Sequence, residues 1–159
     1  MKKILNIIIL VCVIVYFLNK CSQREALENE HEIEIKNANI KAVFNVPDLI
    51  GNNIDQLRVV LGNPIDNDPE PTKLQMKMKF KVWDNSFERS GQILLVTYNP
   101  QNRKVIDFFI NSPDGGVVSD FSGLLKIGNV SMENAAYYIE PVKALKDPTK
   151  FTGIKIVPR

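Results

Sequence analysis

The fold of this chain is best read from residues 47–64, which run PDLIGNNIDQLRVVLGNP. Asn53 followed by Gln56 matches a capping box, in which the two amide side chains bond free backbone groups at the start of a helix. Gly62 follows the last apolar residue, where a helix ends in a left-handed conformation, and Pro64 prevents its continuation. We therefore expect a helix of about two turns, held by packing on a sheet rather than by its own propensity.

Three apolar-rich segments come after this helix. Leu74–Val82 alternates apolar residues with lysines and glutamine, which predicts a strand with one buried and one wet face. Ile93–Tyr98 is apolar on both faces, as in a central strand covered on two sides. Val105–Ile110 completes the pattern. Together the three segments predict an antiparallel meander.

The second half of the sequence predicts further short elements. Phe121–Ile127 and Ser131–Ile139 are expected as helices, and Ile154–Val157 as a last strand. Of the neighbours Tyr137 and Tyr138, one is expected in the core. The predicted fold class is α+β, with short helices packed on a small antiparallel sheet made of the three-stranded meander and a C-terminal strand.

The N-terminus has the order of a bacterial export signal, because two lysines precede the apolar run Ile4–Leu18. As a helix this run is about 22 Å long against a bilayer core of about 30 Å, which favours a cleaved signal peptide. The residues after it lack the small-residue pattern of a cleavage site, which favours a retained signal-anchor. Cys21 is a candidate for lipidation, although Lys20 stands where a lipobox needs a small residue. Signal-anchor, lipoprotein and cleaved signal remain open.

These signals divide the chain into three parts. Residues 1–21 form the signal-anchor or signal peptide, residues 22–43 a charged spacer, and residues 44–159 the α+β domain. Lys2 and Lys3 favour an amino terminus inside the cell. We therefore expect a single-pass membrane protein of the bacterial envelope, in contact with the membrane through residues 4–18 and with its C-terminal domain outside the cytoplasm.

Composition excludes several function classes. The net charge is +2, and residues 44–159 hold 14 basic and 13 acidic residues, so nucleic acid is not an expected partner. Both cysteines, Cys12 and Cys21, and the single histidine, His31, precede the predicted domain. The domain therefore offers no thiolate or histidine metal site and no nucleophile–histidine pair. No cofactor and no enzymatic activity are expected, and the remaining catalytic alternative is a carboxylate pair such as Asp84 and Glu88.

Candidate interaction residues lie on and beyond the lysine-rich segment. Lys77, Lys79 and Lys81 would share the wet face of the predicted strand, where they could bind an anionic headgroup or an acidic partner. They could also simply keep that strand from pairing with other chains. Trp83 would either continue this face or fold over the sheet edge against the core, and Phe87 would lie in the turn that follows. Exposed aromatic residues at a sheet rim are favoured interaction anchors.

The spacing Gly51, Asp55, Leu57 and Leu61-Gly62-x-Pro64, followed by antiparallel strands, resembles small envelope domains of the BamE/SmpA and β-lactamase-inhibitor-like type. The resemblance implies an extracytoplasmic α+β module that binds proteins without catalysis. The absent lipobox and the long region after Asn111 depart from that family. We expect a non-catalytic interaction module that binds another envelope protein. The alternative is a binder of an anionic small molecule or lipid headgroup through the Lys73–Lys81 face.

Overall fold

The computed structural model describes residues 40–159, apart from the side chain of Asp114. The predicted membrane anchor, most of the spacer and the candidate lipidation residue Cys21 lie outside the described residues. The helices and strands follow in the order α2 (Val46–Leu49), α3 (Ile54–Leu61), α4 (Lys73–Lys77), β1 (Trp83–Arg89), β2 (Gln92–Tyr98), β3 (Val105–Asn111), the 3-10 helix η1 (Pro113–Gly115), α5 (Ser122–Gly128), β4 (Tyr137–Lys143) and β5 (Phe151–Pro158).

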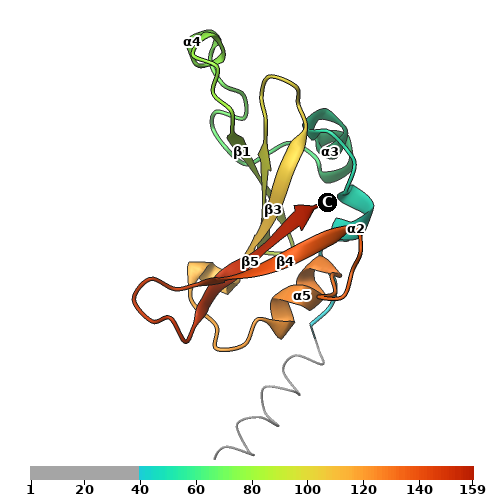
Figure 1. The fold of residues 1–159 in the computed structure, drawn as a ribbon, viewed down its shortest axis with the longest axis vertical. Helices are drawn as coiled ribbons and strands as arrows, with labels where there is room; N and C mark the ends of the chain where they lie inside the picture. The colour runs from blue at the N-terminus through green and yellow to red at the C-terminus, as the bar shows by residue number, and fades with distance from the viewer. Residues whose placement is uncertain (1–39) are drawn as a thin grey trace, which may run out of the picture. The chain divides into compact units, whose positions relative to one another are not determined.

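The strands form one five-stranded antiparallel sheet in the order β1-β2-β3-β5-β4. The meander β1–β3 is continuous in sequence, and the hairpin β4–β5 joins it with β5 beside β3. The chain reaches that hairpin through η1 and α5, which cross one end of the sheet (Figure 1). The α+β class and the antiparallel sheet predicted from the sequence are confirmed.

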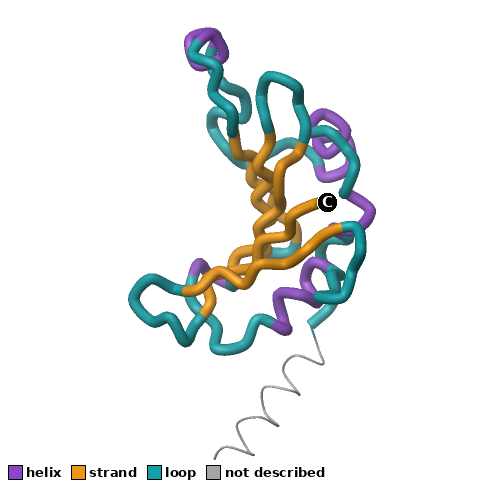
Figure 2. The backbone as a smooth tube through the Cα atoms, viewed as in Figure 1, coloured by secondary structure: helices purple, strands orange, loops and turns teal. Residues whose placement is uncertain are grey.

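Helices α2, α3 and α5 cover one face of the sheet, and the core lies between them and the strands (Figures 1 and 2). Alternate strand residues point into this core, as the period of a half-buried strand requires. The opposite face has no helix over it in the described part of the chain (Figure 2). The largest fully buried side chains are Tyr98, Tyr137, Phe44, Phe87, Phe108, Ile54, Leu57, Leu94, Ile110, Ile154, Ile156 and Val46.

The signals that bound the first helix are confirmed. The side chain of Asn53 accepts from Gln56 N and the side chain of Gln56 accepts from Asn53 N, both at 2.9 Å. Gly62 ends α3 with a φ of 94°, a conformation that residues with a Cβ rarely adopt. Helix α5 and strands β2, β3 and β5 also lie where the sequence predicted them, and Tyr137 is buried while Tyr138 is exposed.

The predicted strand Leu74–Val82 is wrong. Thr72 and Gln75 form a second capping box that starts α4, and Lys79, with a φ of 54°, turns the chain after it. The alternation of lysine with apolar residues did not mark a buried face, because this segment protrudes beyond β1 (Figure 1). The first strand of the meander is instead β1, Trp83–Arg89, which was expected to be a turn.

The predicted helix Ser131–Ile139 is also wrong. Residues 131–136 form turns in which Ser131 Oγ accepts from Glu133 N at 3.3 Å and Asn134 Oδ1 accepts from Ala136 N at 2.8 Å. Such side-chain bonds to nearby backbone compete with helix formation. The chain then enters β4, which is an edge strand and therefore tolerates Pro141.

Candidate interaction surfaces

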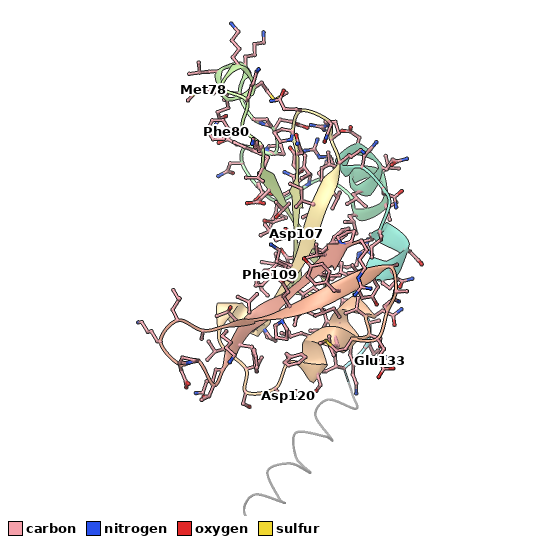
Figure 3. All side chains as sticks on the ribbon, viewed as in Figure 1. Met78, Phe80, Asp107, Phe109, Asp120 and Glu133 are labelled. Carbon is pink, nitrogen blue, oxygen red and sulfur yellow. The ribbon has the colours of Figure 1, made fainter. Side chains whose placement is uncertain are left out.

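Several exposed apolar residues gather on residues 72–82, here called the projection. Its four lysines are all exposed, and its apolar side chains Leu74, Met78, Phe80 and Val82 are exposed as well. Figure 3 shows Met78 and Phe80 on this segment, away from the sheet. Lys77 lies at the end of α4, and Lys79 and Lys81 lie in the return segment. The three candidate lysines therefore remain at the surface, but not as a row on a strand.

Of the two aromatic candidates, Trp83 packs at the sheet edge against the core, as one of its two predicted placements has it, and Phe87 lies deeper than predicted. Trp83 is half-buried against the core, and its Nε1–H donates to the carbonyl of Asp68 at 3.2 Å. Phe87 is 1% exposed and belongs to the hydrophobic core. The assignment of Phe87 to the interaction surface is therefore wrong, because its side chain points inward from β1. Phe87 was misplaced because its segment was expected to be a turn, whereas it belongs to β1.

A cluster of two arginines and two carboxylates holds the loop that leads to the projection; we call Arg58, Arg103, Asp55 and Glu70 the arginine cluster. Arg103 donates to Glu70 at 2.7 and 2.8 Å and also bonds Asp55. Arg58 bonds Glu70 from the other side. These bonds tie α3 and the β2–β3 turn to the loop between α3 and α4, which has no regular structure of its own.

Electrostatics in the arginine cluster favour the charged forms of Glu70, Asp55 and Arg103. The hydrogen bond from Arg103, and then that from Arg58, lowers the pKa of Glu70 to about 2 despite some burial. The hydrogen bond from Arg103 likewise lowers the pKa of Asp55. The same carboxylates raise the pKa of Arg103 further above its ordinary value. The two carboxylates and Arg103 therefore stay charged over the physiological range.

Tyr98 and Asn85 extend this cluster into the core. Arg58 donates to Asn85 Oδ1 through Nε at 3.1 Å and Nη2 at 2.6 Å, and Asn85 is fully buried. The carbonyl of Pro69 accepts from Tyr98 Oη at 3.1 Å, from Asn85 Nδ2 at 2.9 Å and from Arg58 Nη2 at 2.8 Å. Burial raises the pKa of Tyr98. The base of the projection is therefore fixed by a satisfied polar network rather than by apolar packing.

The sheet face without helices carries a row of facing residues across all five strands. Register places Ser86 beside Leu95, Leu95 beside Phe109, Phe109 beside Lys155, and Lys155 beside Glu140. We call the face that contains this row the uncovered sheet face. At its centre lie the two half-buried apolar side chains of Leu95 and Phe109.

An ion pair and a close backbone contact shape the uncovered sheet face. Lys155 Nζ lies 3.0 Å from Asp107 Oδ2, and Asp107 is 6% exposed. The hydrogen bond with Asp107 raises the pKa of Lys155. The ring of Phe109 lies on the backbone of Gly153, where an added Cβ would approach Phe109 Cζ to 2.3 Å. Figure 3 shows Asp107 and Phe109 on this part of the sheet. The carboxylate of Asp107 is therefore held by its ion pair with Lys155.

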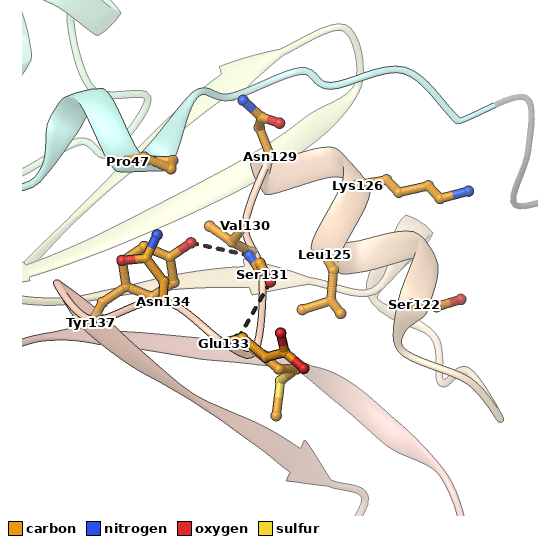
Figure 4. A pocket seen from close by; sticks show the side chains of 11 residues that line it. Pro47, Ser122, Leu125, Lys126, Asn129, Val130, Ser131, Glu133, Asn134 and Tyr137 are labelled. Atoms are coloured by element: carbon orange, nitrogen blue, oxygen red, sulfur yellow. Dashed lines mark hydrogen bonds between the residues drawn. The ribbon is translucent and has the colours of Figure 1, made fainter.

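A shallow groove of about 580 Å³ lies beside α5 (Figure 4). Its wall is partly fixed, because Tyr137 Oη accepts from Ser131 N at 3.0 Å. Leu125 and Val130 line its apolar side, and Glu133 lies at its rim. Charged side chains do not converge in it, so this groove lacks the polar constellation of a catalytic site.

Residues 40–159 lack the groupings that would support several other functions. This part of the chain holds no group of three or more histidine, cysteine or acidic residues that could bind a metal ion. None of its helices has the length and apolar character needed to span a bilayer. Asp84 and Glu88 lie on one strand, four residues apart, hence about 13 Å from each other. Paired catalytic carboxylates of glycosidases lie about 5–9.5 Å apart, so these two do not form such a pair.

The fold defines this part of the chain as an α+β domain with a five-stranded antiparallel sheet covered by helices on one face. The chain matches no protein-family model, no curated protein and no solved structure. The resemblance to BamE/SmpA-type domains therefore stays a prediction that rests on the quoted residues.

Proposed function

We propose that this protein is a membrane-tethered component of the bacterial envelope whose α+β domain binds another protein without catalysing a reaction. The export-like N-terminus supports the location. The binding role is inferred from the uncovered sheet face. A sheet normally buries its apolar side chains against a second layer, and within residues 40–159 only one side of this sheet has such a layer.

The composition of the uncovered sheet face fits a protein interface. Leu95 and Phe109 provide an apolar centre, and the Asp107–Lys155 pair beside them is already neutralised within the chain. Interfaces commonly combine an apolar centre with a polar rim whose charges are paired. A partner can cover this centre without leaving an isolated charge buried, which would otherwise cost several kcal/mol.

A photoreactive amino acid in the uncovered sheet face tests this proposal in living cells. Thr97 lies on that face next to Asp107, and its replacement by a photoreactive phenylalanine derivative should capture the partner. Val59, 86% exposed on α3, is the matched control on the covered side of the sheet. We expect a specific adduct from position 97 and none from position 59. Equal capture at both positions, or none at position 97 in folded protein, would contradict the proposal.

The location needs a separate test. A reporter enzyme that folds only outside the cytoplasm, fused after Arg159, should be active. A second fusion that removes residues 1–21 is the matched control and should be inactive. Activity of a cytoplasm-specific reporter at the same position would refute the proposed orientation.

The charge of the projection favours a second candidate function, the binding of an anionic small molecule or lipid headgroup through Lys73–Lys81. Four exposed lysines lie within nine residues, and the sequence has no carboxylate between Pro71 and Trp83. Such a local excess of one charge attracts anions over about a Debye length.

A further inference from the structure

The exposed apolar side chains of the projection indicate a contact site. Leu74 is 68% exposed, Met78 64%, Val82 54% and Phe80 39%, all within nine residues. Single exposed apolar residues are ordinary, whereas a contiguous group at the surface marks a contact site. The projection has no buried face of its own, because α4 contains no buried residue.

Lysines alternate with these apolar residues. None of Lys73, Lys77, Lys79 and Lys81 makes an ion pair with a described residue, so their charges are not neutralised within residues 40–159. Lysine has a long apolar stem, so its ammonium can stay at a polar boundary while its neighbours enter an apolar phase.

This mixture distinguishes a lipid surface from a protein partner. Lysine is depleted at protein–protein interfaces, which favour arginine and aromatic residues. Lysines next to Leu, Met and Phe are instead typical of segments that lie in the boundary between headgroups and acyl chains. Each lysine near an anionic bilayer strengthens binding, and an apolar side chain adds its own transfer free energy.

Contacts with the rest of the domain already order the projection before it binds. The arginine cluster fixes its base through Glu70, and Gln101 Nε2 donates to the carbonyl of Met76 at 3.2 Å. The Thr72–Gln75 capping box fixes its helix. A segment that is already ordered loses little conformational entropy on binding.

The projection lies at the end of the sheet opposite to the start of the described chain. Val43 N and Phe44 N both donate to the carbonyl of Ile127 at 2.9 Å, which ties residues 43–44 to α5. Helix α5 and the projection lie at opposite ends of the domain (Figure 1). Residues 43–44, at the start of the described chain, therefore lie away from the projection.

We propose that the projection docks on the surface of an anionic lipid bilayer, with Leu74, Met78 and Phe80 entering the headgroup region and the lysines contacting lipid phosphates. This inference rests on the second candidate function and names its ligand as a bilayer rather than a free anion. It makes the projection a membrane contact separate from the N-terminal apolar run.

Vesicle co-sedimentation tests this docking with the full chain. The protein is placed in phosphatidylcholine nanodiscs, so that the N-terminal apolar run is accommodated, and is mixed with dense vesicles. Vesicles that contain phosphatidylglycerol should sediment the nanodiscs, and vesicles of phosphatidylcholine alone should not. Binding should fall steeply at about 1 M salt, where the Debye length is about 3 Å. Soluble glycerol phosphate should not displace the protein.

Two pairs of variants assign the binding to the projection. Lys77→Gln with Lys81→Gln should weaken partitioning about 25-fold, roughly fivefold for each lysine. Lys41→Gln with Lys104→Gln removes the same charge from two exposed positions elsewhere and should change it less than about threefold.

A second variant and its control test the contribution of the apolar side chains to partitioning. Leu74→Ser should weaken partitioning about tenfold. Val59→Ser, at an apolar position on α3 that is more exposed than Leu74, should leave it unchanged.

Three outcomes would overturn the docking proposal. Equal sedimentation with both kinds of vesicle would remove the role of the lysines. Equal loss in the projection variants and their controls would show that overall charge or hydrophobicity, rather than this segment, drives binding. Displacement by glycerol phosphate would indicate a site for a small anion. Photo-crosslinking at Thr97 is independent of all three, so failure here leaves the protein-binding proposal to be judged by its own test.

Discussion

Replacement of Glu70 by glutamine should destabilise the domain at neutral pH, because it removes the charge on which Arg58 and Arg103 converge. The pKa of Glu70 falls from 4.5 to about 2 on folding. At about 1.36 kcal/mol per pKa unit, the difference corresponds to at most about 3.4 kcal/mol. The side chain is 44% exposed, so solvent screens much of this interaction. We expect a loss of about 1–2 kcal/mol.

The pH dependence of this loss has a defined sign. A carboxylate whose pKa is lowered by folding stabilises the native state above its unfolded pKa, and that stabilisation disappears as the pH falls through the folded pKa. The difference between wild type and Glu70→Gln should therefore be full above about pH 5 and shrink toward zero near pH 2. Asp55 also has a lowered pKa, so the difference between the two proteins, rather than the wild-type curve, isolates Glu70.

Urea unfolding of the full chain in a neutral detergent measures this effect, since urea does not screen charges. Trp83 is the only tryptophan and bonds the loop that Glu70 holds, so its fluorescence reports on the relevant region. Glu88→Gln is the matched control, because Glu88 is exposed and pairs with no described residue. Equal losses in the two variants, or a Glu70→Gln loss that persists at pH 2, would refute the electrostatic reasoning.

Three further substitutions test the fold by the same unfolding measurement. Asn53→Ala removes one half of the first capping box and should cost about 1 kcal/mol, and a wild-type midpoint would show that packing alone sets this helix start. Gly153→Ala places a methyl group 2.3 Å from Phe109 Cζ and should cost about 1–3 kcal/mol, whereas Gly116→Ala, which meets only a contact of 3.5 Å, should be near neutral. Phe87→Ala should lower the free energy of unfolding by about 3–5 kcal/mol, because it truncates a core side chain. A much smaller loss would indicate that Phe87 lies at the surface.

Local signals in the sequence predicted local structure well. The Asn53–Gln56 capping box, Gly62 and the apolar runs of β2, β3 and β5 each depend on residues close together in the chain, and each appears as expected. Helix α5 was also predicted from residues that lie close together in the chain. The α+β class could therefore be derived before any coordinates, because its helix ends and most of its strands are defined by short-range patterns.

Elements that depend on distant contacts were not predictable in this way. The first residues of β4 were expected to end a helix over Ser131–Ile139, because the sheet partner of β4 lies beyond the turn at residues 144–150 and only pairing with β5 makes this segment extended. The arginine cluster joins Asp55, Arg58, Glu70 and Arg103. Only the Asp55–Arg58 spacing of three residues could have been noticed in the sequence. Nothing local indicates that Glu70 and Arg103, 33 residues apart, would meet.

The projection shows why period alone is an incomplete signal. Alternation of apolar and charged residues predicts a strand because a sheet supplies an apolar phase on one side and water on the other. Residues 72–82 have this alternation but find no apolar phase among the described residues, and the Thr72–Gln75 capping box makes the first turn helical. The apolar side chains of this segment still lack an apolar environment, and its lysines need a polar one. A bilayer surface provides both within the length of a side chain, because the headgroups lie directly above the acyl chains. The feature that misled the strand prediction is for this reason the main argument for a membrane contact.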